Sequence, residues 1–187
     1  MPRITTRVFA QALTTIISRL NEAKAQCLVD QYVLIGGFAV SAWGVPRATQ
    51  DLDFALALGS SDPSKLCKHL SAEFRPGEPD DPLRGVYQTS IRIEDRSVPV
   101  QLILLPTSWD SIIFNNVELL TIFDCSVPVV SWQSLILLKL YAGGPQDLLD
   151  AQQILAVRQP TQSERDNLSS LANQVNLTTT WQKLVNH

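Results

Sequence analysis

Residues 51–58, DLDFALAL, constrain the fold more than any other stretch because polar and apolar side chains alternate along them. Alternation with period two is typical of a β-strand, whose successive side chains point to opposite faces of a sheet. Asp51 and Asp53 would therefore share one face, about 7 Å apart along the chain. Two such carboxylates repel each other beside an apolar core. Either a divalent cation binds them, or this is an edge strand with one wet face.

A pair of glycines precedes this predicted strand. Residues 32–36, YVLIG, are typical of a short buried strand, and residues 37–44, GFAVSAWG, of a short helix. Glycines at such a turn let a phosphate approach the free N–H groups at the start of a helix. A tight turn without a ligand is the alternative. Taken together, the two aspartates and Gly37 predict one cleft that holds a phosphate and a metal ion.

Elsewhere the pattern predicts an α/β (α+β) fold, a mixed sheet flanked by helices. The first helix would run from Arg7 to Val29 with Thr5 or Thr6 as its cap, and a second from Ser61 or Asp62 to about Phe74. The other expected elements are a polar loop over 75–85, strands over 86–94, 98–105 and 117–123, and helices over 109–115, 132–142, 146–158, 161–173 and 178–186. Residues 1–130 would form the α/β core, and 131–187 a helical region packed on it or part of one single domain.

Composition excludes several classes of protein. A chain of 187 residues with 45% hydrophobic residues is long enough to bury a core. Three cysteines without a CxxC pair argue against a disulfide framework and indicate a reducing, cytoplasmic setting. No apolar run approaches the ~20 residues of a membrane span. A net charge of −3 argues against a strong nucleic-acid footprint.

The order of strand, GG, short helix and G-x-x-R-x-T-x-D-L-D-F resembles the nucleotidyltransferase superfamily, which shares its fold with DNA polymerase beta. The chain is most similar to small bacterial AbiEii toxin-like nucleotidyltransferases. Residues 135–155, LILLKLYAGGPQDLLDAQQIL, resemble the downstream helical motif of that family. The resemblance covers about residues 30–158 and implies a nucleotidyltransferase-like mixed sheet followed by a C-terminal helical region.

The resemblance also implies roles for individual residues. Asp51 and Asp53 would be catalytic and would bind Mg2+ or Mn2+. The nucleotide-binding residues would be Gly36, Gly37, Arg47, Thr49 and Lys139. Lys139 fits equally well as a residue whose stem covers apolar surface on an amphipathic helix. Asp147 and Asp150 match family positions, but they also fit a first-turn acid and a solvated residue.

One position departs from the family pattern. Relatives usually supply a third carboxylate from a later strand, where this chain has Gln101. Glutamine offers a neutral oxygen to a metal ion but cannot act as a base. We expect Gln101 to lie on the same face as Ile103, close to the two aspartates.

Three functions remain open from the sequence. The first is transfer of a nucleoside monophosphate from a nucleoside triphosphate to a hydroxyl of an RNA, a protein or a small molecule. The second is a catalytically degenerate relative that binds a nucleotide or an antitoxin-like partner protein. The third is a structural protein that keeps the fold without a ligand.

Overall fold

The computed structural model describes residues 2–58, 63–78 and 82–186, with side chains described from residue 6 onward. The elements follow in the order α1 (Pro2–Ala25), β1 (Gln31–Ile35), α2 (Gly36–Ala42), β2 (Leu52–Ala57), α3 (Pro63–Leu70), β3 (Glu73–Pro76), β4 (Gly85–Ile93), β5 (Arg96–Leu104), a 3-10 turn (Thr107–Trp109), α4 (Asp110–Phe114), β6 (Val117–Ile122), β7 (Cys125–Val130), α5 (Trp132–Ala142), α6 (Pro145–Arg158), α7 (Gln162–Gln174) and α8 (Thr178–Val185). This mixed order of strands and helices confirms the predicted α/β class.

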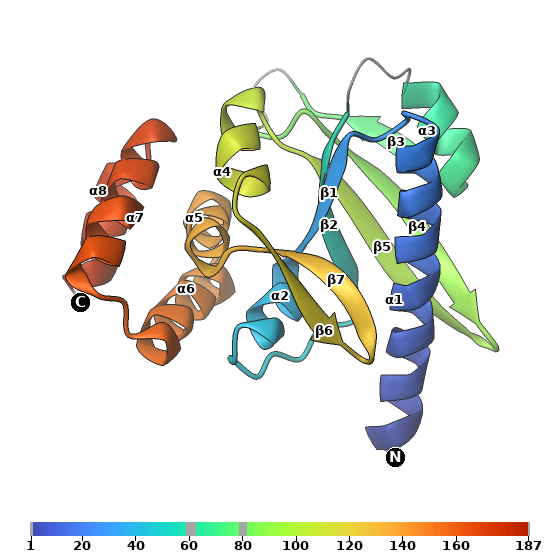
Figure 1. Cartoon of the computed structure of the whole chain (residues 1–187), viewed down its shortest axis with the longest axis horizontal. Helices are drawn as coiled ribbons and strands as arrows, with labels where there is room; N and C mark the ends of the chain where they lie inside the picture. The colour runs from blue at the N-terminus through green and yellow to red at the C-terminus, as the bar shows by residue number, and fades with distance from the viewer. Residues whose placement is uncertain (1, 59–62, 79–81, 187) are drawn as a thin grey trace.

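One mixed sheet contains all seven strands, in the order β3-β4-β5-β2-β1-β7-β6. β2 pairs antiparallel with β1 and parallel with β5, and β1 pairs parallel with β7. The remaining neighbours are antiparallel. Figure 1 shows α1 along the sheet and α7 and α8 at the other end of the molecule, with α5 and α6 between them. β2 therefore lies near the middle of the sheet and is not an edge strand.

The two faces of the central strands have different surroundings. Tyr32 of β1 donates a hydrogen bond to Asn21 of α1 at 2.6 Å, and its ring contacts the ring of Phe54 in β2. These side chains belong to the face covered by α1. Side chains alternate between the two faces along each strand. Ile35 of β1 and its partner Asp53 of β2 therefore point to the face opposite Tyr32 and Phe54. That second face carries the cleft described below.

A single cluster of buried apolar side chains runs through the whole fold, from Val8 in α1 to Leu184 in α8. The sheet part ends with β7 at Val130 and the helical part begins with α5 at Trp132. Buried residues on both sides of this point belong to the same cluster. None of the helices in the described part of the chain has the length and apolar character that a membrane span requires.

Two predicted helices have different ends in the structure. α1 begins at Pro2 and ends at Ala25, so Thr6 lies inside the helix and does not cap it; the side chain of Thr5 lies outside the described residues. α3 ends at Leu70, not at Phe74. Ser71, with φ +51°, turns the chain after the helix. Residues 73–76 then pair with β4, because the sheet supplies hydrogen-bond partners for their backbone groups. Ser61 and Asp62, the expected start of α3, lie outside the described residues.

Two strands were not predicted. β3 takes the first residues of the expected loop over 75–85, of which residues 79–81 are not described. β7 pairs with both β6 and β1 although Pro128 lies in its middle. The hairpin between β6 and β7 turns at Phe123 and Asp124, whose φ angles are +49° and +62°. Such a turn usually contains asparagine or glycine, so this pair gave no turn signal.

Candidate functional site

A cleft of about 400 Å3 lies where β1, β2 and β5 meet α5. Its polar side chains and one glycine come from the first residue of α2, from β2 and the residue before it, from β5, and from the helices α5 and α6. They are Gly36, Asp51, Asp53, Gln101, Lys139 and Asp147. Apolar side chains form the rest of the lining: Ile35, Pro82, Leu83, Ile103, Leu105, Leu135, Leu138, Tyr141 and Ala142. The cleft thus has one charged part and one apolar part.

The strand register brings Asp51 and Asp53 into the charged part. Asp53 of β2 lies between Ile35 of β1 and Gln101 of β5. Asp51 directly precedes β2, and its Oδ1 accepts a hydrogen bond of 2.7 Å from the hydroxyl of Thr49. Both aspartates line the same cleft, as their period-two spacing predicts.

The environment of Asp53 disfavours its charged form. Burial raises the pKa of Asp53 most, the charge of Asp51 raises it further, and the charge of Lys139 lowers it, with the pKa reaching about 7. The charge of Asp51 therefore raises the pKa of Asp53 by more than the charge of Lys139 lowers it. A divalent cation between the two carboxylates would remove both the repulsion and the need for protonation.

The two glycines are required for close packing around the aspartates. Gly36 has φ +68°, and a Cβ at this position would overlap the carboxylate of Asp53. A Cβ at Gly37 would lie 2.8 Å from the Cβ of Thr49. Gly36 lines the cleft, whereas Gly37 is buried and is not among the described residues that line it. The expected role of Gly37 at the cleft stays a prediction, and the first turn of α2 packs this glycine against Thr49.

Gln101 lies beside Asp53, and the family resemblance implies a third carboxylate at this position. It is the register partner of Asp53 on β5, and it lines the cleft together with Ile103. Among the described residues, no group of three or more His, Cys, Asp or Glu side chains could hold a metal ion. The oxygen donors that the chain offers here are two carboxylates and one neutral amide.

Lys139 reaches the cleft from α5 and is held by two carboxylates of α6. Its Nζ lies 2.8 Å from Oδ1 of Asp147 and 3.0 Å from Oδ2 of Asp150. Gly143, with φ +67°, ends α5, and Pro145 starts α6. This tight corner between the helices brings the lysine and the two acids together.

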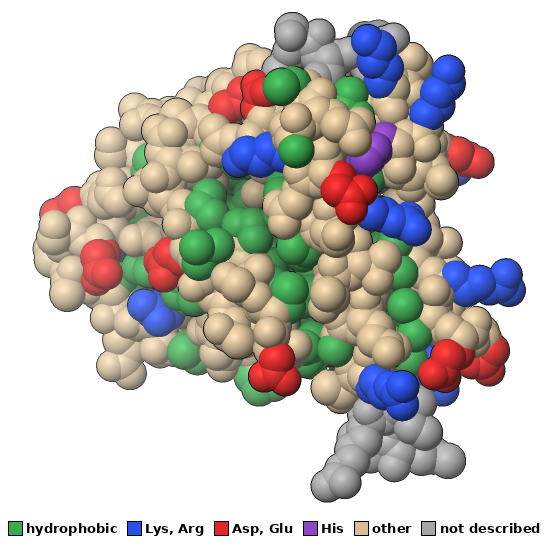
Figure 2. All heavy atoms as spheres, turned by 45° about the vertical axis from the view of Figure 1, so that its right-hand side comes forward, with side chains coloured by type: hydrophobic (Ala, Val, Ile, Leu, Met, Phe, Trp, Pro, Cys, Tyr) green, Lys and Arg blue, Asp and Glu red, His purple; other side chains and the backbone are tan. Residues whose placement is uncertain are grey.

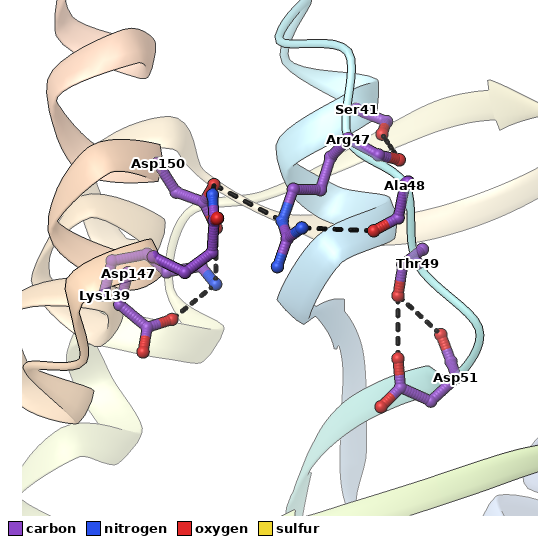
Figure 3. A network of polar contacts seen from close by, with 9 residues as sticks. Ser41, Arg47, Ala48, Thr49, Asp51, Lys139, Asp147 and Asp150 are labelled. Atoms are coloured by element: carbon purple, nitrogen blue, oxygen red, sulfur yellow. Dashed lines mark hydrogen bonds and ion pairs between the residues drawn. The ribbon is translucent and has the colours of Figure 1, made fainter.

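Arg47 does not reach the cleft, although the sequence resemblance assigns it to the nucleotide. Its Nε lies 3.4 Å from Oδ1 of Asp150, and its guanidinium donates a hydrogen bond of 3.1 Å to the carbonyl of Ala48. Figure 3 shows this side chain extending from the loop before β2 toward α6. Neither Arg47 nor Thr49 is among the described residues that line the cleft. Both instead make contacts that fix the loop carrying Asp51.

The apolar part of the cleft was missed at the sequence level. Leu135, Leu138 and Ala142 lie on one face of α5, and the Tyr141 hydroxyl donates a hydrogen bond of 2.7 Å to the carbonyl of Pro82. A spacing of three, four and seven residues along a predicted helix would have placed these α5 side chains beside Lys139. No comparable pattern connects Pro82 and Leu83 with α5, because they lie more than fifty residues earlier in the chain.

One face of the molecule carries charged side chains of both signs. Figure 2 shows one face of the molecule with apolar side chains across its middle and with lysines and arginines interspersed with acids toward its margins. Among the described side chains on this face, the basic residues do not gather into one large patch.

Comparisons with known proteins support the fold. No protein-family model and no curated protein sequence matches the chain. The structure is similar to that of an antigenic nucleotidyltransferase-like protein from Paracoccidioides brasiliensis, with TM-score 0.50 and 16% identity over 93% of both chains. It is also similar to the solution structure of the antibiotic-resistance factor ANT(2'')-Ia, with TM-score 0.53 and 12% identity over 95% of this chain and 99% of that one. A crystal structure of ANT(2'')-Ia in complex with adenylyl-2''-tobramycin gives TM-score 0.51 and 12% identity over 90% and 96% of the two chains. The chain therefore has a nucleotidyltransferase-like fold.

Proposed function

We propose that the chain is a metal-dependent nucleotidyltransferase, which transfers a nucleoside monophosphate from a nucleoside triphosphate to a hydroxyl group. The observation that carries this proposal is the position of Asp51 and Asp53 in one cleft beside Gly36 and Lys139. The fold supports it, and so does the neighbour that binds adenylyl-2''-tobramycin, a nucleoside monophosphate joined to an acceptor. The closer relation to AbiEii-like proteins is a further part of the proposal.

The residues in the cleft fit Mg2+ or Mn2+. Carboxylate and amide oxygens are ligands that these hard cations prefer, and magnesium is commonly bound by one or two carboxylates plus substrate phosphates. The raised pKa of Asp53 indicates negative charge that the protein leaves uncompensated. Asp51 and Asp53 would bind the metal, with the Gln101 amide oxygen as a further donor. When bound, the metal would stabilise charge on the attacking and leaving oxygens.

The other residues of the cleft would bind and orient the substrate. Lys139 supplies the positive charge for the phosphates, since its Nζ is the cation that lines the cleft among the described residues. Gly36 allows close approach at the start of α2 because a side chain there would overlap Asp53. Arg47 and Thr49 would act indirectly, by holding the loop in front of β2.

The acceptor is proposed to be uncharged or anionic. Of the three carboxylates that line the cleft, Asp51 and Asp53 are assigned to the metal and Asp147 is bound to Lys139. None of the described cleft carboxylates is left to attract a polycationic acceptor. The apolar part around Leu138 and Tyr141 would bind an uncharged, flat portion of the nucleotide or the acceptor.

Gln101 favours a second candidate function. A glutamine beside Asp53 cannot take the proton of an attacking hydroxyl. The chain would then be a degenerate relative that binds a metal–nucleotide complex or an antitoxin-like partner without turnover.

A pyrophosphate-release assay tests the proposal. The wild-type chain is incubated with each of the four ribonucleoside triphosphates, Mg2+ or Mn2+, and a mixture of hydroxyl acceptors. We expect metal-dependent release that Asp53→Asn abolishes and that Asp166→Asn, a change on exposed α7, leaves unaltered. Nucleotide binding without release would favour the degenerate relative. Absence of both binding and release would contradict both candidates.

A further inference from the structure

Asp150 is buried more completely than the other carboxylates near the cleft. Its side chain has 0% exposure, whereas that of Asp147 has 28%. Three side chains from three segments reach it: Lys139 of α5, Arg47 of the loop before β2, and Gln146 of α6. The Gln146 amide donates to Oδ1 at 2.9 Å. A carboxylate is costly to bury without partners, and these three side chains are the partners that surround Asp150.

Lys139 lies between two pairs of acids. It is bound to Asp147 and Asp150, yet it lines the cleft with Asp53, and its charge already acts on the Asp53 carboxyl. A lysine ammonium is a point charge on a flexible stem. Without its α6 partners, Lys139 would pair with Asp53. Such an internal pair would occupy the carboxylate that the metal needs.

We propose that Asp150, together with Asp147, is a positioning residue that holds Lys139 away from Asp53 and balances its charge. Asp51 and Asp53 then stay available for a divalent cation, and the ammonium faces the phosphates instead of the metal ligands. Through Arg47 the same carboxylate also fixes the loop that carries Asp51. This inference rests on the proposed function.

A double-mutant cycle read out by Mn2+ titration calorimetry, with a nonhydrolysable nucleotide present, tests the inference. Asp150→Asn is expected to weaken Mn2+ binding about tenfold or more, as loss of a group that orients metal ligands commonly does. The same substitution made on a Lys139→Met background is expected to leave the Mn2+ affinity nearly unchanged, because that background has no ammonium at residue 139 that could pair with Asp53. Gln146→Ala is the matched control. It removes a hydrogen bond to Asp150 but keeps both ion pairs, so the Mn2+ affinity should stay that of the wild type.

An equal loss of Mn2+ affinity in both backgrounds would overturn the inference, since a merely structural role does not depend on Lys139. If Asp150→Asn does not fold, Asp147→Asn replaces it in the same cycle, because Asp147 is partly exposed. Failure of the wild-type chain to bind Mn2+ would contradict the proposed function. The crystal structure of metal-free Asp150→Asn tests the inference separately: Lys139 Nζ within about 4 Å of the Asp53 carboxylate would support it. An ammonium still bound to Asp147 alone would overturn it.

Discussion

Two pairs of carboxylates lie in or beside the cleft that Lys139 lines, and they differ in what balances their charge. Asp147 and Asp150 have cations within ion-pair distance, and Asp150 is fully buried. Burial, and after it the charge of Asp51, raises the pKa of Asp53 to about 7. A pair of carboxylates with cations at ion-pair distance connects parts of the fold, here α5, α6 and the loop before β2. An uncompensated pair in a cleft marks a place for an external cation.

The compensated pair should respond most strongly to truncation. Asp150→Ala leaves the cations of Lys139 and Arg47 without their buried partner, which typically costs about 3 to 5 kcal/mol. Asp147→Ala, at a partly exposed position, should cost no more than about 1 kcal/mol. Urea unfolding of the two variants measures the difference. Equal losses would show that burial of Asp150 does not set its importance.

The uncompensated pair should respond in the opposite direction. The folded pKa of Asp53 is about 7 against an ordinary value of 3.8, so the favourable contribution of its protonated form is complete below about pH 4. This contribution is lost as the pH rises through 7. Asp53→Asn should therefore be more stable than the wild type at pH 8, on the order of 3 kcal/mol, and equally stable at pH 4. Thermal unfolding at both pH values measures this.

A difference in stability that does not depend on pH would contradict the account of Asp53. Asp166→Asn serves as the control, because this exposed residue of α7 lies outside the cleft lining. It should change stability little at either pH. Added Mg2+ should narrow the difference between Asp53→Asn and the wild type at pH 8, since the ion stabilises only the chain with both carboxylates.

Gly36 and Gly143 form a matched pair that tests how tightly the chain packs around Asp53. Gly36 and Gly143 have nearly the same φ, +68° and +67°. A Cβ at Gly143 meets only the Leu140 carbonyl at 3.7 Å, whereas one at Gly36 overlaps the Asp53 carboxylate. Gly143→Ala should cost about 1 kcal/mol from backbone strain, and Gly36→Ala about 1 to 2 kcal/mol more from overpacking. Chemical denaturation of both variants checks this, and equal costs would mean that Asp53 moves freely.

The smallest expected effect concerns Gln101. Gln101→Asp adds a carboxylate beside Asp53 and should strengthen Mn2+ binding about tenfold, or about 1.4 kcal/mol. It should also raise pyrophosphate release if the wild type is degenerate. Gln133→Asp, on the first turn of α5 and outside the described cleft lining, controls for added charge. Weaker Mn2+ binding by Gln101→Asp would remove Gln101 from the metal site.

The sequence predicted the elements that carry a strong local pattern. Alternation in 51–58 was sufficient to place Asp51 and Asp53 on one side of a strand, and the glycine pair marked the turn beside them. β7 was missed because Pro128 lies inside it and its turn contains Phe123 and Asp124. A strand in the middle of a sheet can thus lack a local signal when its neighbours in space supply the pairing.

The contacts around Asp150 could not be predicted from the sequence. Arg47 and Asp150 are more than a hundred residues apart, and no periodicity links a loop before a strand to a helix near the end of the chain. The resemblance to a family singled out both Arg47 and Asp150. It implied that Arg47 binds the nucleotide directly. In the structure this arginine contacts Asp150 and the carbonyl of Ala48. The packing of α6 determines which cation lies beside which carboxylate. This packing cannot be read from the sequence.

We propose that Asp51 and Asp53 stay open for a divalent cation. A crystal structure of the chain soaked with Mn2+ and a nonhydrolysable nucleoside triphosphate, with diffraction measured at the manganese edge, tests this most directly. We expect an anomalous peak bound by both carboxylates, with the phosphates directed toward Gly36 and Lys139. A cleft without that peak, or manganese bound at Asp147 and Asp150 instead, would contradict it.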